Sequence, residues 1–232
     1  DADTYFGKGS LNAAKRGVGA NISAVNAVMS GDFNNAFSAI RPPGHHAETE
    51  KAMGFCIFGN VAIAAKYAIE NHKLKRVAVV DFDVHHGNGT QEILWDDPNV
   101  LFVSTHQMPL WPGSGTHEEH GKHQNILNIP IQANTDGPAF RQKFDEIILP
   151  RLDSYKPEIL IISAGFDAHY KDPLANIELM TEDYEWITHR LCDIADEHAD
   201  GRLISSLEGG YNLAALAESV AVHVKVLMER SK

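Results

Sequence analysis

The sequence contains few of the features that mark secreted or membrane proteins. Only two cysteines, Cys56 and Cys192, occur in 232 residues. Two are too few for a disulfide scaffold, so a reducing, cytoplasmic compartment is the default expectation. No apolar run approaches the ~18 residues that a membrane-spanning helix needs, and no signal peptide is visible. These absences argue against a disulfide-rich extracellular domain and against a helical membrane protein.

Basic residues are also scarce. Lysine and arginine number 20 against 31 aspartates and glutamates, which leaves a net charge of -11. This balance is a poor match for the phosphates of nucleic acids, so we expect no direct nucleic-acid partner. A cationic peptide or a polyamine would suit it, although ordinary solubilising charge explains it equally well. The composition does not indicate an oligomeric state.

The chain does contain enough apolar residues for a sheet buried on both faces. It is 44% hydrophobic and 22% charged, which predicts one domain over residues 1–232. Strand-like runs alternate with helical ones, and this alternation predicts a three-layer α/β/α fold with a mainly parallel central sheet. The predicted strands are Ala36–Ile40, Val77–Phe82, Val100–Thr105, Ile126–Ile129, Ile159–Ser163 and Leu203–Leu207.

Helices are predicted to begin at polar N-cap residues. The first helix is expected to end at Gly31, and the last to run from Leu213 to Met228. Polar segments follow the strands at residues 41–48, 81–89, 105–115, 165–172 and 208–212. Because ligands bind at the carboxyl ends of strands in open α/β sheets, these five segments predict one site at that edge. The predicted N-caps are Ser10, Asn60, Asp136, Thr181 and Asn212.

A candidate metal site follows the strand at Val77–Phe82. Asp81, Asp83 and His85 alternate there, and residues two apart in an extended strand share a face. Asp167 follows another apolar strand and supplies a further carboxylate. Two carboxylates and one imidazole leave a coordination position free, as catalytic sites require. The alternative is that the aspartates cap turns and that His85 is a satisfied polar residue. His86 points to the opposite face, and we predict a structural role for it.

Adjacent histidines, His45 and His46, lie in a segment that proline and glycine make rigid. Imidazoles titrate near neutrality, so the pair suits a general base that activates water and a general acid that protonates a leaving amine. Each ring would need an orienting partner, and Asp81 and Asn88 are the candidates. A pair of surface histidines, or two further metal ligands, remains an alternative.

Aromatic residues on glycine-rich loops supply the remaining candidates. Gly209 and Gly210 follow a strand and would let the backbone approach a substrate closely. Tyr211 comes next, and its hydroxyl would be placed to donate a hydrogen bond to a carbonyl becoming an oxyanion. Phe55 follows Gly54, and Trp111 precedes a proline and a glycine. Facing each other, these two rings would form a narrow apolar slot for an alkyl chain. Taken singly, each of the three aromatics is better explained by ordinary packing.

Together these segments resemble the histone deacetylase family, which has the arginase/deacetylase fold. The motifs, in chain order, are R-P-P-G-H-H-A-E, G-F-C, D-F-D-V-H-H-G-N-G-T-Q, S-T-H-Q, P-G-S-G, S-A-G-F-D-A-H and L-E-G-G-Y-N. The resemblance extends from about Asp1 to Leu227. Asn88 resembles the class II branch and its bacterial relatives, because class I members usually have aspartate there.

The resemblance implies a metal-dependent deacetylase that releases acetate from acetyl-lysine. It implies Zn²⁺ bound by Asp83, His85 and Asp167, although this ligand set also tolerates Fe²⁺. The acid/base pair would be His45, oriented by Asp81, and His46, oriented by Asn88. Further implied roles are Tyr211 polarising the carbonyl, Phe55 and Trp111 as channel walls, Asp3 at the rim, and a structural K⁺ near Asp81, Asp83, His85 and Ser104.

Several alternatives remain at this stage. The substrate is an acetylated lysine peptide or another acetylated amine, such as an acetylpolyamine or a small acetamide. A dinuclear ureohydrolase would be expected to carry an aspartate where this chain has His169. A non-catalytic acyl-lysine binder would not need the histidine pair or Tyr211. Catalytic domains of the family usually begin some tens of residues before Asp1, so we expect that an N-terminal portion is missing from this sequence.

Overall fold

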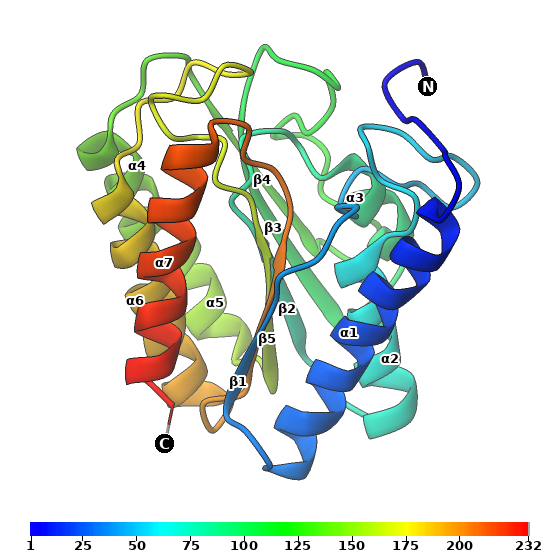
Figure 1. Ribbon diagram of the computed structural model, residues 1–232. Coiled ribbons are helices and arrows are strands. Elements are labelled where there is room, and N and C mark those ends of the chain that lie inside the picture. Colours follow the sequence, from blue (N-terminus) through cyan, green and yellow to red (C-terminus); the bar gives the residue numbers. More distant parts are fainter. Residues whose placement is uncertain (232) are drawn as a thin grey trace.

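The computed structural model describes residues 1–231 and has three layers (Figure 1). Within these residues, six strands form one all-parallel sheet in the order β1-β6-β5-β2-β3-β4, which confirms the predicted fold class. In the same part of the chain, no helix has the length and apolar character to cross a membrane. The strands are β1 (Asn35–Ser38), β2 (Val77–Asp81), β3 (Val100–Gln107), β4 (Ile126–Ile131), β5 (Ile159–Ala164) and β6 (Leu203–Leu207).

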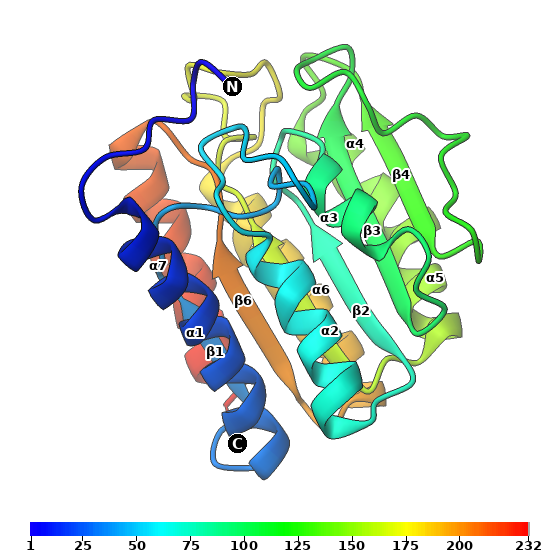
Figure 2. The same ribbon diagram turned by 90° about the vertical axis from the view of Figure 1, so that its right-hand side faces the viewer.

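Helices cover both faces of the sheet, and Figure 2 shows α1 and α2 in front of it. One face is covered by α1 (Ser10–Ser30), α2 (Asn60–His72) and α3 (Asn88–Leu94). The other face carries α4 (Gly137–Lys143), which continues through the π-helical segment Phe144–Ile148 into α5 (Leu149–Tyr155), and also α6 (Thr181–His198) and α7 (Leu213–Glu229).

The central strands are buried on both sides because their side chains alternate between two apolar clusters. In β2, Val77 and Val79 pack with α1 and α2, whereas Ala78 and Val80 pack toward α6. Every residue of β2, β3 and β5 is buried, which is typical of parallel strands covered on both faces. The same alternation turns Asp81, the last residue of β2, toward the face covered by α1 and α2.

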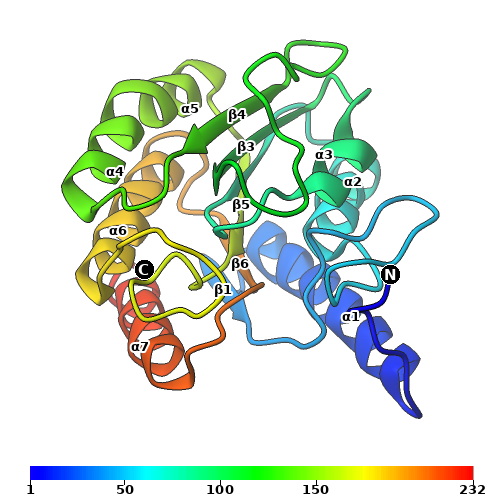
Figure 3. The ribbon, with the colours of Figure 1, turned by 90° about the horizontal axis from the view of Figure 1, so that it is seen from above.

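The strand order places a crevice at the carboxyl ends of β2 and β5. These strands are neighbours, but the chain leaves β2 for β3 on one side and leaves β5 for β6 on the other. Such a reversal of winding direction separates the two connecting loops, and ligands bind between them. Figure 3 looks down on this edge, where the loops that follow the strands gather.

Two of the five predicted N-caps are correct. The side chain of Asp136 accepts a hydrogen bond from the amide of Ala139 at α4, and Asn212 accepts one from Ala215 at α7. The final helix runs to Glu229, one residue beyond the prediction, and Gly31 ends α1 in a left-handed conformation with φ 80°. Local side-chain chemistry was sufficient for these helix ends.

The other three predicted caps, Ser10, Asn60 and Thr181, are wrong because each is the first residue inside its helix. At α6 the carboxylate of Asp183 accepts from the amide of Met180 at 2.7 Å. A carboxylate within the first turn therefore replaces the hydroxyl cap that was expected. The sequence also did not predict α3, and it placed β1 at Ala36–Ile40 rather than Asn35–Ser38.

A buried histidine on the inner side of α7 predicts an acid-sensitive core. His223 lies between the hydroxyls of Thr188 at 2.7 Å and Ser205 at 2.9 Å. Because the Thr188 hydroxyl donates to the carbonyl of Tyr184, His223 Nδ1 donates to Thr188 and Nε2 accepts from Ser205. Burial lowers the pKa of His223 to about 3, so the ring is neutral in the folded protein.

Acidification should therefore favour unfolding through His223. Below about pH 6.5, the pKa of an unperturbed histidine, His223 binds a proton in the unfolded chain but not in the folded one. This one residue should remove about 2 kcal/mol of stability between pH 7 and pH 5. Urea unfolding of His223→Gln should show lower stability at both pH values but a smaller loss between them. An equal loss in variant and parent would contradict the expectation.

Candidate active site

Three potential metal ligands lie together in the crevice between β2 and β5. One donor atom each from Asp83, His85 and Asp167 lies within 4.8 Å of the others, and all three residues are buried. His85 Nδ1 is 3.2 Å from an oxygen of Asp83 and 3.1 Å from one of Asp167. The structure thus brings together the three residues that the sequence predicted as ligands, from loops about 80 residues apart.

The reason for this convergence differs from the one expected. β2 ends at Asp81, so Asp83 and His85 lie in a bend and not on one face of an extended strand. Asp81 Oδ1 accepts from the amide of Asp83 at 3.1 Å, and Asp83 Oδ1 accepts from the amide of His85 at 2.9 Å. Aspartates that bond to the backbone two residues later form tight turns, and these two turns aim the side chains.

The remaining carboxylate oxygens are also held by backbone amides. Gly209 N donates to Asp83 Oδ2 at 2.8 Å, and Val84 N donates to Asp167 Oδ1 at 2.9 Å. A side chain at position 209 would collide with both carboxylates. The glycine is therefore required at this point, where the loop after β6 approaches the cluster.

The charges of the cluster suit a divalent cation. Burial, followed by repulsion from Asp83, raises the pKa of Asp167 to about 7. Burial would lower the pKa of His85, but hydrogen bonds to Asp167 and Asp83 raise it to about 10. The two buried carboxylates repel each other, and positive charge between them relieves this repulsion. Protonation of His85 would supply such a charge. A metal ion would use the same three donor atoms, and carboxylate and imidazole ligands suit Zn²⁺ or Fe²⁺.

The tandem histidines lie beside this cluster, on the loop that follows β1. His45 Nδ1 is 2.9 Å from Asp81 Oδ2, and His45 Nε2 is 3.7 Å from Asp83 Oδ1. Burial alone would lower the pKa of His45, but the carboxylates of Asp83 and Asp81 outweigh it and raise the pKa well above its ordinary value. Asp81 therefore contacts His45 and is not part of the ligand cluster.

His46 has a different environment. Its Nδ1 is 2.8 Å from Asn88 Oδ1, a neutral partner, and its ring lies 3.9 Å from that of His45 between centroids. Burial, and then the positive charge of His45, hold the pKa of His46 well below its ordinary value. The two rings thus have opposite charge preferences: the surroundings of His45 favour its protonated form, and those of His46 favour the neutral form that a general base needs.

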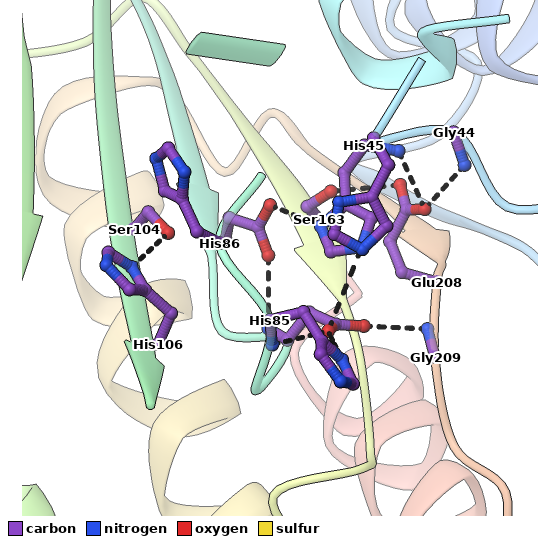
Figure 4. Close-up of polar contacts among 12 residues, drawn as sticks. Gly44, His45, His85, His86, Ser104, His106, Ser163, Glu208 and Gly209 are labelled. Carbon is purple, nitrogen blue, oxygen red and sulfur yellow. Dashed lines mark hydrogen bonds and ion pairs between the residues drawn. The ribbon is translucent and has the colours of Figure 1, made fainter. Parts of the chain in front are cut away.

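Glu208, to which the sequence motif assigned no role, holds the histidine loop in place (Figure 4). Its Oε2 accepts from the amides of Gly44 at 2.6 Å and His45 at 3.1 Å, and its Oε1 accepts from the hydroxyl of Ser163 at 2.9 Å. It is fully buried, and burial raises its pKa to about 7. A charged residue between an apolar strand and two glycines was the signal that could have identified it.

Tyr211 follows the same loop and lines the cavity together with His85, one of the three potential metal ligands. Its backbone amide donates to Asp172 Oδ2 at 2.7 Å, as does the amide of Asn212 at 3.2 Å. Asp172, which the sequence reasoning did not single out, thereby anchors the turn that carries the tyrosine. Burial, with Asp167 and Asp83 adding to it, raises the pKa of the Tyr211 phenol far above its ordinary value. The hydroxyl therefore keeps its proton and can donate it in a hydrogen bond.

A cavity of about 350 Å³ leads to these groups. Phe55 lies 5.9 Å from Tyr211 between ring centroids, and Trp111 lies 4.6 Å from His46. Gly54 has φ 55°, and a side chain there would meet both His46 and Trp111. The cavity is lined by Asp3, His46, Gly54, Phe55, His85, Leu110, Trp111, Leu174 and Tyr211.

Some of the predicted residues lie outside this cavity. Gly210 is not among its lining residues; with φ 136° it forms the turn before Tyr211, where a side chain would meet Leu216. Ser104, on β3 beside Asp81, has its hydroxyl 2.9 Å from His106 Nδ1. His86 bonds to Ser114 and Gln91, and its ring lies 4.6 Å from that of His106 between centroids, so it supports the loop that carries Trp111.

Comparison with known proteins is consistent with this geometry. The family model described as "Histone deacetylase domain" matches residues 1–227. The sequence is 42% identical to "Histone deacetylase 10, chloroplastic" of Oryza sativa subsp. japonica over 94% of this chain and 51% of that protein. It is 41% identical to "Histone deacetylase-like amidohydrolase" of Pseudomonas aeruginosa over 91% of this chain and 57% of that protein.

A solved structure matches at the level of the whole fold. The crystal structure of the HDA15 HD domain superposes with a TM-score of 0.93 at 36% identity, covering 99% of this chain and 65% of that one. The chain thus spans about half to two thirds of the length of these relatives.

Proposed function

Since the chain belongs to the histone deacetylase family, whose members hydrolyse amide bonds, we propose that it is a zinc-dependent deacetylase that removes acetyl groups from acetyl-lysine. The observation that carries the proposal is one constellation. A buried Asp–His–Asp cluster and a histidine pair of opposite charge preference lie together, and His85, His46 and Tyr211 line the cavity that leads to them.

The apolar walls of the cavity suit the substrate's alkyl chain. Phe55 and Trp111 would enclose the methylene groups of a lysine side chain, and Asp3 at the mouth would accept a hydrogen bond from the substrate backbone. This arrangement holds the acetamide against the histidines and Tyr211. Orientation of this kind removes much of the entropic cost of the reaction.

A divalent metal held by Asp83, His85 and Asp167 would polarise the amide carbonyl and lower the pKa of the attacking water. His46, which is neutral, would take a proton from that water through Nε2 and pass it to the departing amine. His45, which remains cationic beside Asp81, would stabilise negative charge without giving up its proton. The Tyr211 hydroxyl would donate a hydrogen bond to the developing oxyanion.

Further features of the site are included in the proposal. Zn²⁺ is the expected metal, and Fe²⁺ would fit the same donors. A structural K⁺ would bind near Asp81, Asp83, His85 and Ser104, as the family resemblance implies. Both cysteines are free and buried, which fits a reducing, cytoplasmic setting.

A dinuclear ureohydrolase is a poorer fit to the site. His169, at the position where a second aspartate would be expected, accepts a hydrogen bond from the amide of Lys171 and stacks on Tyr170. Within residues 1–231, Asp83, His85 and Asp167 form the one group of three or more such side chains that could hold a metal ion. A binder without catalysis would have no need for the charge difference between His45 and His46.

The proposal is tested by assaying acetylated peptides and acetylpolyamines with defined metals. We expect acetate release from acetyl-lysine peptides, its loss after chelation, and its recovery with about one equivalent of Zn²⁺. Undiminished hydrolysis after complete metal removal would overturn the proposed chemistry. Turnover of acetylpolyamines but not of peptides would show that the reaction is deacetylation but that the substrate is not acetyl-lysine. A metal content of two per chain would favour the dinuclear ureohydrolase.

A further inference from the structure

Asn88 bonds to two groups at once, and only one of them belongs to the site described above. Its Oδ1 faces His46 Nδ1 at 2.8 Å, while its Nδ2 donates to Glu48 Oε1 at 2.7 Å. The sulfur of Met53, a weaker acceptor, also lies 3.4 Å from Nδ2. Glu48 therefore contacts neither the cavity nor the metal ligands but reaches the histidine through the amide.

This arrangement settles which atoms donate. A carboxylate can only accept hydrogen bonds, so the amide must present its NH₂ group to Glu48 and its oxygen to His46. An oxygen facing His46 Nδ1 requires the proton to be on that nitrogen. The Nε2 atom of the neutral ring then carries the free electron pair, which a general base needs.

We infer that Glu48 is a positioning residue that, through Asn88, fixes the tautomer of His46. The inference rests on the proposed function, since it assigns Glu48 a part in preparing the general base. An asparagine alone would be ambiguous, because its two ends have similar size and can exchange by rotation. With NH₂ turned toward His46, Nδ1 would have to accept, and the proton would move to Nε2.

His45 provides the comparison within the same site. Its partner Asp81 is a carboxylate, which accepts through either oxygen, so no second residue is needed to orient it. The neutral partner of His46 lacks this property. The Glu48 carboxylate, which accepts from the NH₂ group of Asn88, keeps the amide oxygen turned toward His46. No second carboxylate then has to lie directly against the ring.

The backbone holds both ends of the Glu48–Asn88–His46 chain in register. The amide of Glu48 donates to the carbonyl of Lys51 in a tight turn, and Thr90 N donates to the carbonyl of His45 at 3.1 Å. Gly89 lies so close to Ala47 that a side chain there would collide with its backbone. The start of α3 and the histidine loop therefore form one rigid unit, and the polar contacts between them are built in.

Charge reversal tests the inference. In Glu48→Lys a donor would replace the acceptor, turning the amide oxygen to Lys and NH₂ to His46. We expect kcat to fall about 100-fold with little change in KM, within the range for residues that orient reacting groups. Asn88→Asp alone would place a new carboxylate against that of Glu48 and should lower kcat tenfold or more. Glu48→Gln, whose amide can accept or donate, should lose only a few-fold.

The double variant gives the sharpest result. In Glu48→Lys with Asn88→Asp, the carboxylate accepts from both the lysine and His46, so the required tautomer returns. We expect activity within about tenfold of the parent and above both single variants. Glu50→Lys, the same charge reversal two residues away on the exposed loop, is the matched control and should leave activity unchanged.

A measurement independent of turnover separates this inference from the proposed function. Nitrogen-15 NMR of the His46 ring should show the proton on Nδ1 in the parent and in the double variant, and on Nε2 in Glu48→Lys. The same ring signal in all three proteins would overturn the inference, as would a double variant no more active than its weaker single. Failure of the parent to hydrolyse any acetylated substrate would instead overturn the proposed function.

Discussion

Replacing Asp167 by asparagine should abolish metal binding at micromolar concentrations and reduce hydrolysis at least about 1000-fold. The amide keeps an oxygen in place but removes one of two negative charges that face His85. A metal that stabilises transition-state charge contributes several kcal/mol, and each 1.36 kcal/mol corresponds to a tenfold change in rate. The expected loss therefore exceeds that of any change outside the cluster.

The same substitution should not weaken the metal-free protein, which distinguishes a ligand from a structural carboxylate. The pKa of Asp167 is raised to about 7 by burial and by Asp83, so its charge opposes folding above about pH 4. Removing that charge should leave the melting temperature of the metal-free protein at pH 8 unchanged or higher. A large decrease would show that Asp167 serves packing and not metal binding.

Asp136→Asn provides the matched control. Asp136 also follows a strand of the sheet, but its side chain caps α4, a task that asparagine performs about as well. Metal content, measured by elemental analysis, and acetate release should both equal those of the parent. A comparable loss in the control would mean that any aspartate at this edge of the sheet affects the site indirectly.

Tyr211→Phe should lower kcat by about 10²–10³-fold, the range for removal of one oxyanion hydrogen bond. The phenol is kept protonated by burial and by the nearby carboxylates, so the hydroxyl acts only as a donor. KM should change little, because the ring that faces Phe55 remains. Steady-state kinetics on one acetyl-lysine peptide, with metal content measured in parallel, separates these contributions.

Tyr170→Phe is the control for Tyr211. Tyr170 is half exposed and stacks on His169, outside the cavity. Its variant should match the parent in kcat. If Tyr211→Phe kept more than a third of the parental kcat, Tyr211 would not stabilise the transition state, and the oxyanion would have to be stabilised by other groups.

The fold could be predicted because its signals are local and repeated. Apolar runs such as Val77–Val80 and Ile159–Ile162 exceed what a half-exposed strand would carry, so burial on both faces followed directly. Helix caps were harder to predict. Asp136 caps α4 as expected, but at α6 the capping side chain is Asp183 and not Thr181. At α6 a carboxylate within the first turn supplies the bond, whereas α1 and α2 begin after glycines and have no side-chain cap.

By itself the sequence determined the α/β class and the edge of the sheet where the polar segments gather, because periodicity and strand ends are properties of consecutive residues. It also named Asp83, His85 and Asp167 as candidate donors. Only the tertiary structure decided how they are aimed, through turns beyond β2, and it alone revealed Glu208 beneath the histidine loop and Glu48 behind Asn88. Hydrogen bonds require positions accurate to a few tenths of an ångström, and only packing between distant segments provides that accuracy.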